Sequence, residues 1–446
     1  MSNYSKDFWH PMYHPNQAKE HEPIHIVKGD GVFIEDDKGH KLLDGVAGLW
    51  CVNVGHNHPE MKSAITQQLD ELEYFQLFDG ASHPPATKIA EKMVGMTQQE
   101  NMRRVFFTSG GSDSVEMSLK LARQYHVING EPERKKYISL KNGYHGVHFG
   151  GGSVNGINVN RRVYEPLMPG CIHVDAPWTY RNPWNCEDPD ELAHYCAAQL
   201  EAEIQFQVPD TIAAFIAEPV MGAGGVIVPP EKYWPLVREI CDKYGILLIA
   251  DEVVTGFGRS GSMFGSRGWG VKPDMMCLAK GLSSGYIPMG AVMINERMES
   301  AWDSNADFFG TIFAGYTYSG HPLACAAGLA SLNIVERENL PENARVQGAY
   351  LLDKLQPFAE KFKSVGEVRG KGLMLAFDLV SDKKTRTSVD PTEPFANNVA
   401  SVARREGVLV RPVGPKIILS PPLVFTEENC DQLVDALDIA FSEVDR

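Results

Sequence analysis

The chain has 446 residues, a length that suits two or three structural units rather than a single hydrophobic core. Its 43% hydrophobic and 22% charged residues are ordinary for a folded protein and argue against disorder or a fibrous structure. The formal net charge of −15 disfavours general attraction to nucleic acid or to anionic membranes.

The sequence carries no sign of secretion, membrane insertion or metal binding. No run reaches the roughly 20 apolar residues that span a bilayer, and the first residues lack a basic start followed by an apolar stretch. None of the eight cysteines is spaced as Cys-x-x-Cys, and the spacing of His56, His58 and His83 is poor for a metal site. We therefore expect a cytoplasmic protein without a metal ion.

The first predicted elements form a β-hairpin, with strands at residues 32–35 and 41–44 on either side of a turn at residues 37–39. From Pro59 the hydrophobic period changes to that of a helix, with Pro59 near its first turn. The apolar face of this helix is Met61, Ile65, Leu69 and Leu72.

The central part of the chain alternates short apolar strands with helices. These strands show little polar alternation, as expected when both faces of a mostly parallel sheet are covered. Helices are predicted at residues 115–125, 192–204 and 233–241. The predicted strands are residues 104–108, 137–140, 211–217, 245–250, 274–279 and 289–294.

The last hundred residues have a different pattern, typical of a smaller α+β unit. We predict strands at residues 372–379, 408–410 and 417–419, a helix at 394–405, and a last helix capped by Thr426. The predicted organisation is a segment of residues 1–58 that packs with the small domain, a large domain of residues 59–325, and a small domain of residues 326–446.

Two charged residues follow predicted strands directly: Asp251 after GILLIA and Lys280 after DMMCLA. Ligands of open parallel sheets bind beyond the carboxyl ends of the strands, so both residues can meet one ligand. Pyridoxal phosphate (PLP) requires a partly buried lysine for its aldehyde and a carboxylate for its pyridine nitrogen. Either residue alone would be interpreted as a solvated loop residue, but the pair favours PLP.

A glycine-containing loop is a candidate phosphate site. Residues 108–114, TSGGSDS, follow a strand and open a helix, where free N–H groups and the helix dipole favour an anion. The alternative is a plain turn with Ser112 as the cap. Tyr144, after the strand at residues 137–140, could stack on a flat cofactor, although a packed loop aromatic is the commoner case.

Two further charged residues end strands. Glu218 follows TIAAFIA, and Arg411 follows Val408-Leu409-Val410. An arginine at such a place could bind a substrate carboxylate through two hydrogen bonds. The alternative for each residue is an ordinary ion pair.

Several motifs, in order and spacing, resemble those of class III aminotransferases: DEVVTGFGR at residues 251–259, Lys280-Gly281, and GYIPMGA at residues 285–291. The resemblance runs from about Trp50 to the C-terminus. It implies a fold-type-I PLP-dependent transferase, with a mostly parallel central sheet in the large domain and a smaller α+β domain. The resemblance also implies a homodimer with shared active sites, alone or paired into a tetramer.

The resemblance also assigns site residues. Lys280 matches the lysine that binds PLP as a Schiff base and transfers the proton. The matched cofactor-binding positions are Gly111 and Ser112 at the phosphate, Tyr144 and Val253 on the ring faces, Glu218, Asp251 at the pyridine nitrogen, and Thr317, which reaches the neighbouring subunit's phosphate. A hydroxyl-bearing residue of the family loop is replaced by Gly110, which leaves the backbone contacts.

GLW at residues 48–50, EPVMGAGGV at 218–226 and VRP at 410–412 resemble the ω-amino acid or amine:pyruvate subgroup. In that subgroup Trp50, Phe78 and Arg411 match substrate-binding positions. The expected reaction moves the amino group of an ω-amino acid or primary amine to pyruvate, giving an aldehyde or ketone and alanine. The alternative is a 4-aminobutyrate or ornithine type that uses 2-oxoglutarate.

Two other classes of enzyme lack their signatures here. No Gly-x-Gly-x-x-Gly links a strand to a helix as in nicotinamide-dependent dehydrogenases, and no Gly-x-Ser-x-Gly elbow indicates an α/β-hydrolase. A non-catalytic scaffold would have no use for Lys280 and Asp251 together.

Overall fold

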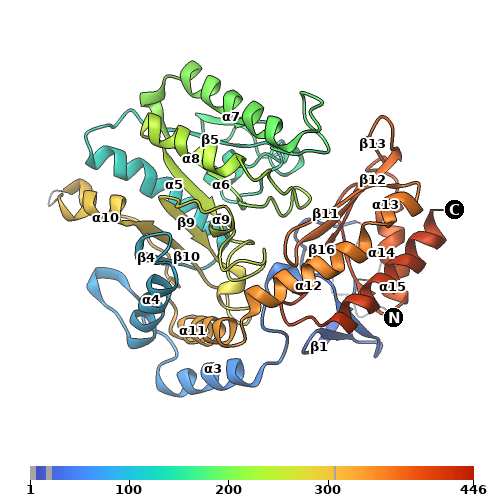
Figure 1. The fold of residues 1–446 in the computed structure, drawn as a ribbon. Coiled ribbons are helices and arrows are strands. Elements are labelled where there is room, and N and C mark those ends of the chain that lie inside the picture. Colours follow the sequence, from blue (N-terminus) through green and yellow to red (C-terminus); the bar gives the residue numbers. More distant parts are fainter. Residues whose placement is uncertain (1–6, 17–22, 306–307, 446) are drawn as a thin grey trace.

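The computed structural model describes residues 7–16, 23–305 and 308–445. Two units are visible in Figure 1, a larger one built on a central sheet and a smaller one on the right that holds the C-terminal strands and helices. No helix within the described ranges is both long and apolar enough to cross a membrane.

The large unit is organised by a seven-stranded sheet within the described residues. All strands run parallel except β10, which is antiparallel to both of its neighbours. The order is β4 (Met102–Thr108), β10 (Gly290–Asn295), β9 (Met275–Leu278), β8 (Leu247–Asp251), β7 (Ile212–Ala217), β5 (Lys136–Leu140) and β6 (Cys171–Val174).

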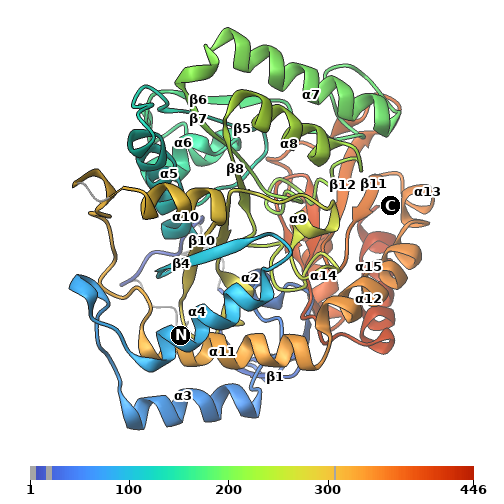
Figure 2. The ribbon, with the colours of Figure 1, turned by 60° about the vertical axis from the view of Figure 1, so that its left-hand side comes forward.

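Helices cover both faces of this sheet, which explains why its strands lack polar alternation. Met275 and Cys277 of β9 pack with residues of α5 (Gly111–Ile128), whereas Met276 and Leu278 pack with residues of α4 (Pro84–Met96) on the other face. Over β7 and β8, α7 (Pro189–Phe206) and α8 (Tyr233–Tyr244) cover the α4 face and lie side by side in both views (Figures 1 and 2).

The N-terminal segment joins the small unit. Strands β1 (Ile26–Asp30), β2 (Phe33–Asp36) and β3 (Lys41–Asp44) form a sheet that β14 (Val408–Leu409) completes by pairing parallel to β3. The predicted hairpin is therefore present, with one strand more than the sequence indicated.

A second antiparallel sheet forms the rest of the small unit, in the order β11 (Val365–Gly370), β12 (Leu375–Asp382), β16 (Lys416–Leu419) and β15 (Arg411–Pro412), with β13 (Thr387–Ser388) beside β12. Thr426 caps the last helix through a capping box with Asn429, as the sequence predicted in part. The helices of this unit are α12 (Leu340–Leu355), α13 (Phe358–Lys361), α14 (Phe395–Arg405) and α15 (Glu427–Val444).

A long helix connects the two units. Helix α11 (Pro322–Arg337) packs along α3 (Pro59–Glu71) and α4, and α3 and α11 run beside each other at the bottom of Figure 2. The boundary predicted at residue 325 falls inside α11. Shorter elements are α2 (Ala47–Trp50), η1 (Phe78–Gly80), α6 (Phe149–Val154), η2 (Asn158–Asn160), η3 (Pro209–Thr211), α9 (Gly265–Gly268), η4 (Lys280–Leu282), α10 (Glu296–Asp303) and η5 (Phe308–Gly310).

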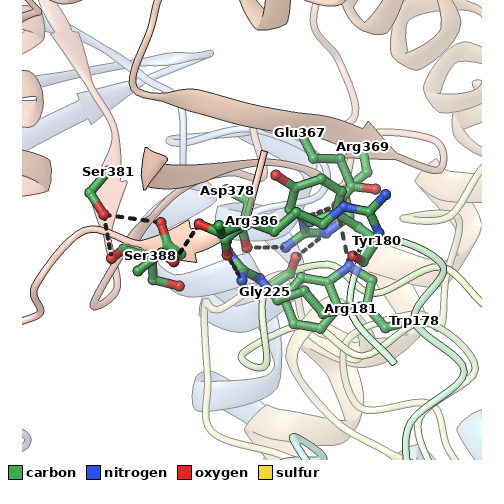
Figure 3. Close-up of polar contacts among 12 residues, drawn as sticks. Trp178, Tyr180, Arg181, Gly225, Glu367, Arg369, Asp378, Ser381, Arg386 and Ser388 are labelled. Carbon is green, nitrogen blue, oxygen red and sulfur yellow. Dashed lines mark hydrogen bonds and ion pairs between the residues drawn. The ribbon is translucent and has the colours of Figure 1, made fainter. Parts of the chain in front are cut away.

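A group of charged and aromatic side chains joins the units at the edge of the small sheet (Figure 3). Arg369 lies 2.6 Å from Glu367 and 3.5 Å from Asp378, its guanidinium covers the ring of Trp178 at 4.6 Å, and Arg181 lies 2.6 Å from Asp378. We call these five residues the Arg369 cluster. The Arg369 Nε also donates to the carbonyl of Gly225, in the loop after β7, at 2.8 Å.

Candidate active site

A cavity of about 380 Å³ opens at the carboxyl ends of the central strands. This is the place where open parallel sheets bind ligands, because loops of several strands converge there. Seven of the predicted site residues line the cavity, each just after a strand end or at the start of α5: Gly111, Ser112, Tyr144, Glu218, Asp251, Val253 and Lys280.

Lys280 begins η4, two residues after β9, and its side chain is half-buried on the cavity wall. Burial lowers the pKa of its amine, against the opposing effect of Asp251 and Glu218. A lowered pKa increases the fraction of neutral amine, which is the form that attacks a carbonyl. Lys280 thus has the electrostatic surroundings of a nucleophilic or proton-transferring lysine.

Asp251, the last residue of β8, is held by hydrogen bonds from both sides. Its Oδ2 lies 2.8 Å from Nδ1 of His145, and its Oδ1 accepts from the Val253 N–H at 3.2 Å. The side chains of His145 and Asp251 are 0% and 3% exposed, and His145 Nε2 has no hydrogen-bond partner among the described residues. The contact between Nδ1 and Oδ2 therefore fixes the orientation of both the imidazole ring and the carboxylate.

The start of α5 forms the anion-binding wall. The backbone N–H groups of its first turn have no partner within the helix, and a Cβ added at Gly111 would lie 2.8 Å from Val253 Cγ1. Ser112 Oγ accepts from the Val147 N–H at 3.2 Å, which fixes the next loop against the helix start. The site can therefore hold a phosphate on the backbone of residues 110–112 and a flat ring between Val253 and Tyr144.

Glu218 ties the aromatic wall to the loop after β7. It accepts from the N–H groups of Tyr144 and Gly222, each at 2.8 Å. Burial raises the pKa of Glu218 to about 7 and also raises the pKa of the Tyr144 hydroxyl. The carboxyl group thus positions Tyr144 through the backbone and is close to its protonation midpoint at neutral pH.

The structure places four predicted site residues away from the cavity lining. Trp50 is 3% exposed and packs in the core of the large unit, while its neighbour Cys51 lines the cavity. Phe78 lies on a separate groove of about 900 Å³. Thr317 is exposed, and its carbonyl accepts from the Tyr74 hydroxyl at 2.8 Å.

Arg411, the fourth, does not line the cavity but acts on it. It is half-buried, and its charge lowers the pKa of Lys280. Its guanidinium forms no ion pair with a carboxylate in the described part of the chain, and burial lowers its pKa. A partly buried guanidinium without a counter-ion is suited to bind a carboxylate from outside the chain.

Two residues of the cavity wall, Cys51 and His145, were not predicted as site residues. The only signal for His145 was its position next to Tyr144, and nothing marked Cys51 apart from its place after Trp50. Among the described residues, no group of three or more His, Cys, Asp or Glu side chains is arranged to hold a metal ion.

The fold and this site define a PLP-dependent transferase: a lysine and an aspartate at adjacent strand ends share one cavity with a helix N-terminus and an aromatic wall. The family model for class III aminotransferases matches residues 15–441, so the chain belongs to that family. It is a PLP-dependent aminotransferase, which confirms the predicted fold class, enzyme class and cofactor.

Characterised relatives cover nearly the whole chain. The putrescine–pyruvate aminotransferase of Pseudomonas aeruginosa is 41% identical over 415 residues, 92% of this chain and 88% of that protein. The diaminobutyrate–2-oxoglutarate transaminase of Halomonas elongata is 39% identical over 423 residues, 94% of this chain and 90% of that protein.

A solved amine transaminase from an uncultivated Pseudomonas species, in its PLP-bound internal aldimine form, is 56% identical to this chain. The match covers 99% of this chain and 100% of that one, with a TM-score of 0.98. An (S)-enantioselective omega-transaminase from Thermomicrobium roseum is 39% identical, with a TM-score of 0.93 over 98% of this chain and 96% of that one.

Proposed function

We propose that this enzyme transfers the amino group of a primary amine or ω-amino acid to pyruvate, giving an aldehyde or ketone and alanine, with Lys280 as its catalytic residue. The observation that carries the proposal is that Lys280 and Asp251 line one cavity beside the first turn of α5. When bound, PLP would supply an electron-withdrawing ring and an aldehyde carbon able to carry the amino group between the two substrates.

The chain's own residues have distinct tasks in this proposal. Lys280 binds the cofactor and, once released, takes a proton from the donor carbon and returns it to the cofactor carbon. Asp251, oriented by His145, holds the proton on the pyridine nitrogen. Residues 110–112 bind the phosphate, and Tyr144 and Val253 enclose the ring.

The preference for pyruvate rests on Arg411, a half-buried guanidinium whose charge lowers the pKa of Lys280 and which has no carboxylate partner among the described residues. One guanidinium matches the single carboxylate of pyruvate, whereas 2-oxoglutarate carries a second carboxylate that would need another cation. The relative that is named for putrescine and pyruvate supports this choice, while the relative named for 2-oxoglutarate keeps the alternative open.

We also propose a homodimer, with Phe78 and Thr317 acting in the partner's site. Phe75, Phe78 and Tyr318 are exposed aromatic side chains. Exposed aromatic side chains of this kind are enriched at subunit interfaces. A cytoplasmic location is consistent with the eight cysteines, all of which are free.

The first test removes the lysine. Lys280→Ala should lose the visible absorbance of lysine-bound PLP and lower turnover by at least roughly 1,000-fold, because both the covalent attachment and the proton carrier are lost. Absorbance spectra and alanine formation from amine plus pyruvate measure the two effects. Lys232→Ala, at an exposed ion pair with Asp190, is the control. A Lys280→Ala protein with normal spectrum and turnover would reject the assignment.

The second test concerns substrates. Arg411→Ala should raise KM for pyruvate and for ω-amino acids by roughly 10- to 100-fold while changing KM for an uncharged arylalkylamine little, because only the first two bring a carboxylate. Initial rates with a donor panel, first with pyruvate and then with 2-oxoglutarate, give both the acceptor and the role of Arg411. Equal losses for all donors would contradict that role.

A further inference from the structure

The backbone at Lys280 has an unusual conformation. Its φ is +42°, in the left-handed region that non-glycine residues rarely adopt. Ser284 and Gly285, in the same turn, have φ values of +52° and +76°. A side-chain-bearing residue stays in this region only when its surroundings impose it, so the contacts behind the turn determine where the Lys280 amine points.

The segment from Cys51 to Val54 lies directly behind this turn. The Val54 N–H donates to Ser284 Oγ at 3.0 Å. A Cβ added at Gly281 would lie 2.3 Å from Asn53 Nδ2, and one added at Gly285 would lie 3.1 Å from Cys51 Cβ. The residue after Lys280 is therefore in close contact with the Asn53 side chain and cannot move toward it.

Asn53 is 1% exposed and is held from three directions. Its Nδ2 donates to the Phe257 carbonyl at 3.1 Å, and its own carbonyl accepts from the Leu423 N–H at 3.0 Å. Its Oδ1 accepts from Arg259 Nη2 at 2.9 Å. Asn53 thus connects the N-terminal segment to the loop after β8 and to the C-terminal unit.

Arg259 completes this arrangement without a counter-ion. It is 0% exposed, and within the described residues its guanidinium donates to the carbonyls of Leu373, at 3.3 Å, and Pro421, and to Asn53. Its own carbonyl accepts from the Leu373 N–H at 3.0 Å. Burial lowers its pKa to about 9, so it remains charged at neutral pH.

We propose that Asn53 and Arg259 are positioning residues that hold the Lys280 turn in its left-handed conformation. The proposal rests on the proposed role of Lys280 and adds to it the residues that aim its amine. Neither side chain lines the cavity, so both act through the backbone of residues 280–285. Because Asn53 bonds both to the loop after β8 and to the C-terminal unit, the direction of the amine depends on how the small unit is docked.

The experiment compares Asn53→Ala and Arg259→Lys with Arg134→Lys as PLP-loaded enzymes. Asn53→Ala empties the space behind Gly281, and Arg259→Lys keeps the charge but loses the planar fork. Arg134 is the control, because it is a buried arginine that likewise donates to carbonyl groups, those of Pro209, Ile212 and Tyr244, although it also pairs with Glu131 and Asp210, and it is far along the chain from Lys280.

Three readouts separate positioning from stability: the melting temperature, the pH titration of the visible PLP absorbance, and the single-turnover rate with saturating amine. We expect Asn53→Ala and Arg259→Lys to shift the absorbance titration and to slow the single turnover by roughly 10- to 100-fold, as for a misplaced catalytic group. Arg134→Lys should lower the melting temperature and leave the other two readouts unchanged.

The proposal is overturned if both site variants keep the parental titration and single-turnover rate and differ from it only in melting temperature. If Asn53→Ala does not fold, Arg259→Lys alone decides between the same two outcomes. A failure of the Lys280 assignment is distinguishable, because Lys280→Ala would then keep the absorbance that it should lose.

Discussion

Two arginines join the large and small units, and their surroundings are opposite. Arg369, 8% exposed, is paired with Glu367 and Asp378 and covers the ring of Trp178 (Figure 3). Arg259, 0% exposed, donates only to uncharged oxygen atoms among the described residues. One interface region therefore neutralises its buried charge, and the other does not.

The difference shows what each arginine can contribute. A buried charge loses its hydration, and carboxylate partners in good geometry offset this cost better than carbonyl dipoles do. Arg369 is thus suited to stabilise the docking of the units. Arg259 is poorly explained by stability alone, whereas its rigid fork fixes the relative position of three segments behind Lys280.

Replacing each arginine by methionine should distinguish the contributions of the two regions to stability. Arg369→Met should lower the free energy of unfolding most. It leaves Asp378, which is 1% exposed, with Arg181 as its remaining ion-pair partner, and it leaves Glu367 with the Trp178 Nε1–H but without an ion pair. We expect a loss of about 4 kcal/mol in the free energy of unfolding. Arg259→Met removes a charge and the hydrogen bonds that this charge donates to neutral oxygen atoms. We expect it to lower the free energy of unfolding by about 1–2 kcal/mol.

Denaturant unfolding of the PLP-loaded variants measures this contrast, and Arg369→Lys, which keeps the charge, is the matched control. The ranking of activity should be reversed, with Arg259→Met slower in single turnover than Arg369→Met at temperatures where both are folded. An Arg259→Met enzyme that is less stable than Arg369→Met but equally active would contradict the different roles assigned to the two arginines.

Much of the large unit could be predicted because its strands are buried on both faces and end in charged residues. The abrupt change from GILLIA to Asp251 and from DMMCLA to Lys280 indicated both the strands and the site. Short edge strands gave no such signal: β6 has only one buried residue, and β11 alternates charged residues that belong to the Arg369 cluster. Helices α4, α11 and α12 were also missed.

The supports of the site were beyond prediction, because they depend on contacts between distant segments. Asn53 and Arg259 are 206 positions apart, and no local pattern relates them. His145 stood beside a predicted residue, but its bond to Asp251 requires β5 and β8 to be close in the folded sheet. Trp50 was assigned to the pocket from resemblance alone; the structure shows that it is 3% exposed, and its role stays a prediction.

A further effect on stability, which depends on pH, is expected at the other end of the loop that Arg369 holds at Gly225. This loop begins at Glu218, whose pKa is raised by burial from 4.5 to about 7. Below pH 4.5 the carboxyl group is protonated in the folded and unfolded chain alike. Between about pH 4.5 and 7 the unfolded chain releases the proton first, so the Glu218 contribution to stability is lost as pH rises through 7.

In protein freed of PLP, wild type should therefore lose stability relative to Glu218→Gln as the pH is raised from 4.5 to 8, by no more than about 3 kcal/mol. Glutamine does not titrate, and its single oxygen can accept from only one of the N–H groups of Tyr144 and Gly222, a cost that is the same at every pH. Denaturant midpoints of both proteins across this pH range give the difference. If the stabilities of wild type and Glu218→Gln change in parallel with pH, the carboxyl group is already ionised in the folded chain. Glu218 would then resemble Arg369, whose charge is compensated, rather than Arg259, whose charge is not.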